Sequence, residues 1–120
     1  MRIAGYAAIF DAPDRGGDVI RKGAFATRPA RVPLYWQHDP ARIAGMVEQL
    51  EEDARGLRVI ADVDDGAGIA VRAGQGLSFG YRVRACEHNT HRELTDLELI
   101  EVSLVSHPMQ PRARILAVAQ

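Results

Sequence analysis

A hydroxyl, an imidazole and a carboxylate stand out in this sequence as groups that can do chemistry together: Ser78, His38 and Glu101. A serine hydroxyl is a weak nucleophile until a neighbouring base removes its proton, and a third group must orient that base. These three side chains would fill those roles if the fold brings them together. Whether the three groups can act together therefore depends on the strands and loops that carry them.

Ser78 lies in a stretch, residues 75–83, that reads as a strand with two distinct faces. Side chains alternate along a strand, so the large residues share one face and Ser78 shares the other with Gly80 and Arg82. Gly76 and Gly80 leave the hydroxyl clear of bulk on both sides. Such a serine is ready to meet a substrate, although serines in glycine-rich strands also serve turns or tight packing.

Glu101 interrupts an apolar strand at residues 97–105, where it shares a face with Leu99, Ser103 and Val105. Burying an unpaired carboxylate costs several kcal/mol. We therefore expect Glu101 to have a partner, and a histidine is a good candidate. The alternatives are a pairing with an arginine, or an edge strand that leaves the carboxylate in water.

His38 follows a short aromatic strand at residues 34–37 and is followed by Asp39 and Pro40. Its ring would lie at the rim of the fold with Trp36 packed nearby, unless it is merely structural or exposed. Pro40 is expected to close this strand. Asp39 and His107 are alternative candidates for the third position of the site.

A second cluster, Cys86-x-His88-x-x-His91, offers three groups of the kind that bind zinc. No second cluster accompanies it, and the segment reads as an exposed hairpin loop. We therefore predict no metal and no cofactor. Cys86 is the only cysteine, so no disulfide can form within the chain and a reducing compartment is the natural reading.

The totals indicate one ordinary globular domain over residues 1–120. Hydrophobic residues make up 47% and charged residues 26% of the 120, and the formal net charge is −1. The spread of Lys and Arg does not indicate a nucleic-acid surface. No apolar run approaches the roughly 20 residues of a membrane span. A cytosolic protein with no secretion signal is expected.

The coarse pattern predicts a mainly β fold. Strands are expected at residues 3–10, 43–50, 57–63 and 114–118, together with the two strands that carry Ser78 and Glu101 and a return strand from about Arg92. A short helix is expected over 65–73 and a hairpin tip over 87–90. Six or more short strands with one or two short helices favour a small β-barrel, closed or partly open.

The chain also resembles a known family, the prohead (capsid maturation) serine proteases of HK97-type tailed phages. The resemblance covers roughly residues 3–115 and rests on short segments that occur in the family's order: Gly5-Tyr6-Ala7, Gly17-Asp18-Val19-Ile20 with Gly23-Ala24-Phe25, Trp36-Gln37-His38-Asp39, Gly76-Leu77-Ser78-Phe79-Gly80-Tyr81 and Glu101-Val102-Ser103-Leu104-Val105.

The resemblance implies a fold and a set of roles. The fold would be a β-barrel flanked by helices, distantly similar to the herpesvirus assembly proteases. The family's histidine falls on His38, its nucleophile on Ser78 and its acidic residue on Glu101. The family's usual Thr-Phe-Pro is Ser106-His107-Pro108 here, which keeps His107 open as the third residue.

The function that follows is a serine endopeptidase that cleaves the scaffold segment of a major capsid protein, and also itself, inside assembling proheads in the bacterial cytoplasm. Self-association would activate it. The sequence does not identify the groups that would form the oxyanion hole. Backbone amides of a loop, or a water held by Arg112 or Arg114, are the alternatives. The chain would serve a phage or a gene transfer particle, or be a prophage remnant. A non-catalytic capsid-assembly scaffold is the alternative function.

Overall fold

The computed structural model describes residues 1–120 as eight strands and a single short 3-10 turn. The strands are β1 (Arg2–Ile9), β2 (Asp18–Ile20), β3 (Val32–Trp36), β4 (Asp39–Glu52), β5 (Gly56–Val63), β6 (Gly76–His88), β7 (Arg92–Val105) and β8 (Ile115–Ala119). The mainly β prediction is confirmed. The flanking helices implied by the resemblance are wrong for these residues, because no α-helix forms.

The helix expected over residues 65–73 shrinks to one 3-10 turn, Asp65–Ala67. Gly68 follows in the left-handed conformation, with φ 69°. A left-handed residue ends a helix, and glycine adopts that backbone without steric penalty. Gly68 therefore stops the helix after one turn.

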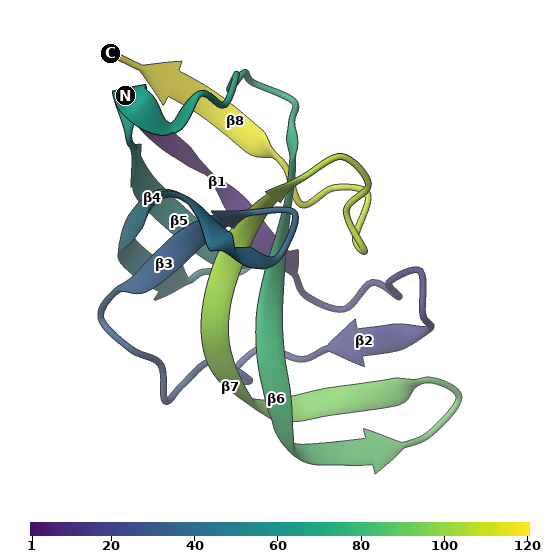
Figure 1. Ribbon diagram of the computed structural model, residues 1–120. Helices are drawn as coiled ribbons and strands as arrows, with labels where there is room; N and C mark the ends of the chain where they lie inside the picture. Colours follow the sequence, from purple (N-terminus) through teal and green to yellow (C-terminus); the bar gives the residue numbers. More distant parts are fainter.

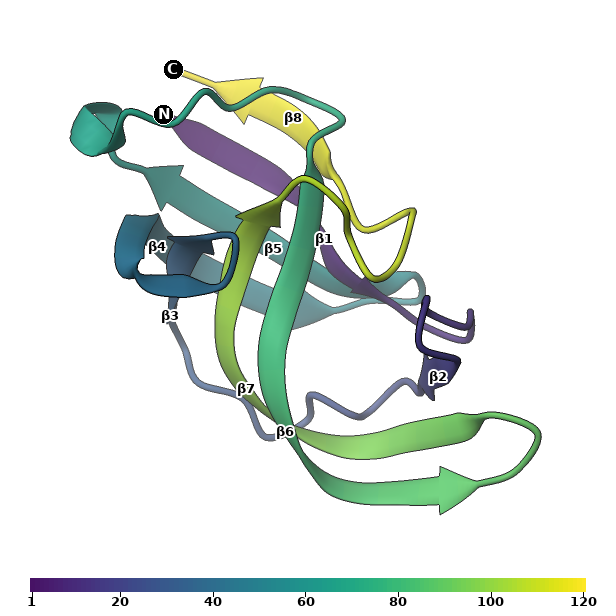
Figure 2. The same cartoon turned by 45° about the vertical axis from the view of Figure 1, so that its right-hand side comes forward.

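The strands form one mixed sheet that curls on itself (Figures 1 and 2). The hydrogen-bonded order is β2-β7-β3-β4-β5-β1-β8, and β6 pairs with the other edge of β7. Only β2 and β3 run parallel to β7. An isolated bridge between Gly76 and Arg114, just before β8, links the far end of this path back to β6. The result is a barrel closed at that point by a single bridge.

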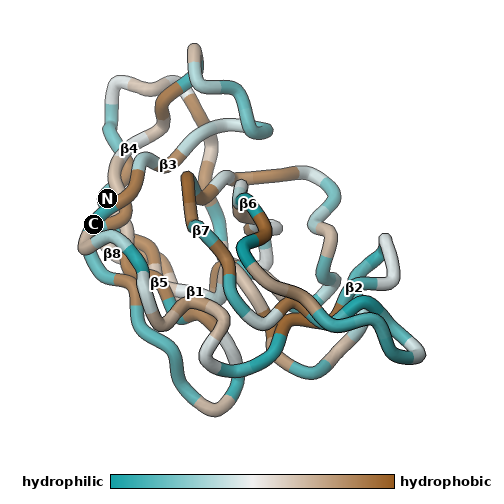
Figure 3. The backbone as a smooth tube through the Cα atoms, turned by 90° about the horizontal axis from the view of Figure 1, so that it is seen from below, coloured by the Kyte–Doolittle hydropathy of each residue, from teal (hydrophilic) through white to brown (hydrophobic).

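The interior is filled by aliphatic side chains and a few aromatics. The tube seen from below in Figure 3 places the strands as a ring, with hydrophobic segments along each. Phe25 is completely buried and meets Phe79 edge-on, with ring centroids 5.3 Å apart. Phe79 belongs to the core face of β6 and therefore fixes which face of that strand points outward.

The β6–β7 hairpin is the longest feature of the fold, and its outer half curves away from the barrel (Figure 2). The pairing is regular where Gly76–Gly80 meets Glu101–Val105, and register shifts follow at Gly80/Tyr81, Val83/Ala85 and Ala85/Cys86. A bulge bends and twists the strand that contains it. The straight inner half therefore belongs to the barrel, and the bulged outer half forms an arm.

Candidate active site

A tight turn between β3 and β4 carries His38. Trp36 pairs with Asp39 across it, and the two residues between them, Gln37 and His38, have φ values of 52° and 60°. Positive φ at both central residues is what a two-residue hairpin turn of type I′ requires. Pro40 does not terminate the structure as expected. It lies in the second position of β4, near a strand end where a missing N–H is tolerated.

Left-handed backbone is uncommon for residues other than glycine, so it persists only where the surrounding structure supports it. Here β7 and the residue that follows it hold the turn in place. The Gln37 N–H donates to the carbonyl of Leu104 at 2.9 Å. The His38 N–H donates to Ser103 Oγ at 3.1 Å. The Gln37 side-chain amide also bonds Ser106 Oγ at 2.6 Å. The imidazole is thus placed by contacts of its own backbone with the strand that carries Glu101.

The central contact of the site joins His38 to Glu101. His38 Nδ1 lies 2.5 Å from Glu101 Oε1, and Glu101 is 5% exposed. A carboxylate only accepts hydrogen bonds, so Nδ1 carries the proton and the neutral ring leaves Nε2 free to accept one. The partner expected for the buried carboxylate is therefore a histidine. This tautomer is the one a general base needs.

This contact also sets the electrostatics of the imidazole. The hydrogen bond to Glu101 raises the pKa of His38, and the negative charge of Glu101 adds to the rise, while partial burial of the ring works against it. The side chain of His38 is 44% exposed. The charged imidazolium is therefore favoured beside Glu101 and remains in contact with water.

Ser103 is the residue of the site to which the sequence assigned no role. Its hydroxyl donates to Glu101 Oε2 at 2.5 Å and accepts the His38 N–H. Ser103 is fully buried. It therefore fixes both the carboxylate and the backbone of the histidine. The available signal was its period-two spacing from Glu101, which places the two side chains on one face of β7.

Ser78 lies directly across the hairpin from Ser103. The two residues are partners in the β6–β7 ladder, and side chains opposite each other in an antiparallel pair share a face. Ser78 is 6% exposed, its hydroxyl makes no hydrogen bond within the protein, and the hydroxyl oxygen still reaches solvent. The structure places Ser78 on the face of Glu101 and Ser103 without a hydrogen bond to His38. Such bonds often tighten only with substrate present.

Gly80 provides the room that Glu101 needs. It pairs with Glu101 across the hairpin, and a Cβ built on Gly80 would collide with Oε1 and approach Cγ at 3.0 Å. Any larger residue would push the carboxylate away from His38. The glycine beside the serine is thus explained by the space needed for the carboxylate opposite.

The other candidates lie apart from this group. Asp39 Oδ1 accepts the N–H of Ala41 within its own turn. His107 is exposed in the segment after β7 and makes no side-chain hydrogen bond. Cys86 Sγ and His88 Nε2 are 3.7 Å apart on the exposed arm, and no group of three ligands for a metal ion forms there.

The arginines considered for an oxyanion-stabilising role differ in placement. Arg114 donates to the Pro111 carbonyl at 2.6 Å and to the Gly74 carbonyl at 2.8 Å. Arg112 is exposed. Arg114 is therefore fixed between two loops, and one end of its guanidinium remains unbonded.

Comparison with known proteins places the chain in a family. The model of the caudovirus prohead serine protease family matches residues 1–120. The chain therefore belongs to the caudovirus prohead serine proteases, in agreement with the resemblance carried by its motifs.

A curated relative and a solved structure agree with this placement. The chain is 28% identical to the prohead protease of Enterobacteria phage HK97 over 131 residues, which covers 95% of the chain and 58% of that relative. A crystal structure of the KSHV protease in complex with a hexapeptide phosphonate inhibitor superposes with a TM-score of 0.69 at 10% identity, covering 99% of this chain and 65% of that one. The second likeness shows a shared fold.

The structure contains no helix that is long and apolar enough to cross a membrane.

Proposed function

We propose that this chain is the serine endopeptidase domain of a prohead protease, with Ser78 as nucleophile, His38 as general base and Glu101 as the group that orients the imidazole. The observation that carries the proposal is the bond between His38 Nδ1 and Glu101, which leaves Nε2 free. The face shared by Ser78, Ser103 and Glu101 supports it. Membership of the protease family supports it as well.

The reaction follows from these groups. Ser78 Oγ attacks the scissile carbonyl while His38 Nε2 takes its proton. Glu101 stabilises the imidazolium, which then protonates the leaving amine, and water enters to release the acyl group from Ser78 by the reverse transfers. General acid–base catalysis of this kind contributes about 10²–10⁴-fold.

The substrate in this proposal is the assembling capsid: the scaffold segment of the major capsid protein, and the protease itself. The place of action is the interior of the prohead in the bacterial host. Cleavage there must await assembly, so activity is expected to depend on self-association at high local concentration. Full activity in a dilute monomer would contradict that dependence.

The test is co-expression with the cognate capsid precursor, read by intact mass. Wild type and Thr90→Ala are expected to trim the precursor, and Ser78→Ala to leave it whole. Thr90 is a suitable control because it is exposed at the tip of the β6–β7 hairpin and its hydroxyl makes no hydrogen bond. Equal trimming by Ser78→Ala, with no trimming when the protease is omitted, would refute the assignment of Ser78. An intact precursor with the wild type would favour the non-catalytic capsid-assembly scaffold.

A further inference from the structure

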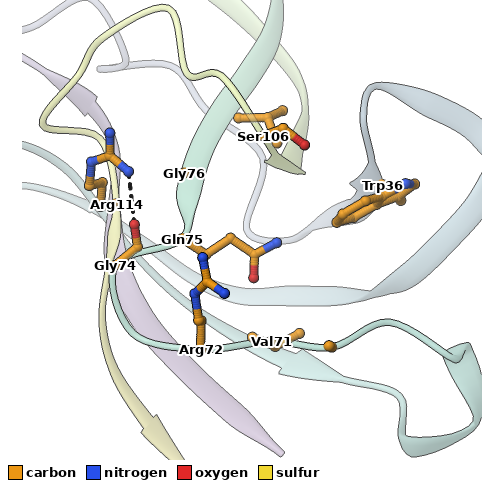
Figure 4. A pocket seen from close by; sticks show the side chains of 10 residues that line it. Trp36, Val71, Arg72, Gly74, Gln75, Gly76, Ser106 and Arg114 are labelled. Atoms are coloured by element: carbon orange, nitrogen blue, oxygen red, sulfur yellow. Dashed lines mark hydrogen bonds between the residues drawn. The ribbon is translucent and has the colours of Figure 1, made fainter.

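A hollow of about 380 Å³ lies beside the catalytic face and is not used by the mechanism. Figure 4 shows Trp36, Arg72, Gln75, Ser106 and Arg114 around it. Neither Ser78 nor His38 lines it. It is therefore separate from the reacting groups but close to them.

The pairing of β6 with β7 shows how close this hollow lies to Ser78. Gly76 and Val105 are cross-strand partners and both line the hollow. The next pair on the same face is Ser78 with Ser103. Two residues of a strand span about 7 Å, roughly the step between alternate side chains of an extended peptide. A peptide held at Ser78 would therefore reach the hollow with a residue near its scissile bond.

The charge of the hollow is positive and unbalanced. Arg72 and Arg114 line it, and no acidic side chain does. No ion pair of the protein includes either arginine. Arg114 is held by the Gly74 carbonyl, as the dashed line in Figure 4 marks, and by that of Pro111, so its guanidinium is fixed without being neutralised. A carboxylate is the natural complement of two such groups.

The third feature is an unpaired acceptor. Gln75 extends its side chain between Arg72 and Trp36 (Figure 4), and its Oε1 is buried with no hydrogen-bond partner. A buried amide oxygen without a donor is unfavourable, and native structures seldom leave one. A backbone N–H of a bound peptide would supply that donor. A simple anion would not.

From these three features we propose that the hollow is a substrate subsite for an acidic residue of the peptide. Arg72 and Arg114 receive the carboxylate, Gln75 accepts a peptide N–H, and Trp36 forms the apolar wall. The subsite rests on the proposed protease function, because it names the class of residue that the enzyme selects near its cleavage site.

Trp36 makes binding measurable without cleavage, since it is the only tryptophan of the chain. The Ser78→Ala protein is titrated with acetyl-Ala-Ala-Glu-Ala-Ala-amide and with the same peptide carrying Gln, up to about 10 mM, while tryptophan fluorescence is recorded. We expect a saturable change with the Glu peptide and affinity about tenfold tighter than for the Gln peptide. Added salt is expected to weaken this preference.

Two arginine variants separate the subsite from general charge effects. Arg72→Gln, added to Ser78→Ala, should weaken the preference for the Glu peptide, because only Arg114 then remains to receive the carboxylate. Arg2→Gln is the matched control, because Arg2 is exposed on β1 and makes no ion pair. The preference should survive there. No saturable change, equal affinity of the Ser78→Ala protein for both peptides, or a preference undiminished in Arg72→Gln would each overturn the subsite. Inorganic phosphate binding as tightly as the Glu peptide would also overturn it.

A cleavage measurement on the active enzyme distinguishes failure of the subsite from failure of the protease function. Peptides spanning the cleavage site of the capsid precursor are compared with Glu or Gln placed at each position. One position should favour Glu about tenfold in kcat/KM, and Arg72→Gln should reduce that preference, whereas Arg2→Gln should keep it. Glu-selective binding without any Ser78-dependent cleavage would refute the protease function and leave the subsite intact. Ser78-dependent cleavage without any preference for Glu would refute the subsite and leave the protease function intact.

Discussion

Ser103 donates a hydrogen bond to Glu101 Oε2 at 2.5 Å and so occupies the carboxylate oxygen that His38 does not use. The same hydroxyl accepts the backbone N–H of His38. One buried serine therefore fixes the distance between the base and the group that orients it. This makes Ser103 a positioning residue, since it acts through its two partners.

The first prediction concerns that serine. Ser103→Ala removes both hydrogen bonds from a buried site, so we expect kcat to fall about tenfold, a loss of about 1.4 kcal/mol, with KM unchanged. Steady-state cleavage of a peptide substrate measures both constants. Thr90→Ala, which removes an exposed hydroxyl at the tip of the β6–β7 hairpin, should change neither. A rise in KM with kcat unchanged would show that Ser103 serves binding instead of positioning.

The second prediction concerns the pKa of His38, which the hydrogen bond and charge of Glu101 raise. The base must be neutral to take a proton, so activity should fall as the pH drops through this raised pKa. Glu101→Gln removes the charge and should lower the pKa of His38. The acid limb of the pH profile of kcat/KM should then move to lower pH, with a smaller maximum. NMR titration of the His38 ring in the wild type and in Glu101→Gln measures the change in its pKa directly.

The same raised pKa links protonation to stability. A group with a higher pKa in the folded state stabilises the fold fully below its unfolded pKa, which for histidine is about 6.5. That contribution is lost as the pH rises through the folded pKa of His38. Urea unfolding of the wild type should therefore show a loss of stability across this window. Glu101→Gln should reduce this dependence of the free energy of unfolding on pH. An unchanged dependence would count against the pairing of His38 with Glu101.

The third prediction concerns Gly80. In Gly80→Ala the new methyl group meets the Glu101 carboxylate, which must move away from His38. Because positioning errors near 1 Å can cost about 10²-fold, we expect kcat to fall by between tenfold and a hundredfold. Gly66→Ala is the matched control, since a Cβ there meets open space. Full activity in Gly80→Ala would mean that catalysis does not require the Glu101 carboxylate to lie at its present position.

The fourth prediction concerns the segment between β7 and β8. Buried Gln110 accepts the N–H of Ile9 at 2.8 Å and donates to its carbonyl at 2.7 Å, which ties this segment to β1. Gln110→Leu leaves both backbone groups without partners and should lower the free energy of unfolding by about 2–4 kcal/mol. Urea unfolding measures this value, and exposed Gln49→Leu should lie within about 0.5 kcal/mol of the wild type. A similarly small effect at Gln110 would contradict the anchoring role.

The sequence was sufficient for most of the strands and for part of the site, but it did not predict β2 and it divided β7 into two strands. The face of β7 that carries Glu101 follows from alternation alone, and the need of a buried carboxylate for a partner pointed to a histidine. The pairing of Glu101 with His38 is confirmed by their hydrogen bond. The catalytic roles of these residues and of Ser78 remain predictions.

The alignment of β6 with β7 was beyond what the sequence can predict. Regular pairs counted back from His88 and Arg92 at the tip would place Ser78 opposite Val102, on the core side of β7. The register shift at Gly80/Tyr81 moves Ser78 opposite Ser103 instead. Bulges depend on tertiary packing more than on local residue types. The left-handed backbone of His38 was equally hidden, because nothing local marks Gln37-His38 as a turn of that kind.

The outer arm of the hairpin has a consequence for how such proteins diverge. All three register shifts of β6 and β7 lie between the tip and the pairs that hold Ser78 and Glu101. An insertion or deletion near the tip can be taken up by changing one of these irregular pairs, and the inner pairs keep their alignment. The arm can therefore vary in length and sequence from one lineage to another, while descendants inherit the same arrangement of reactive groups.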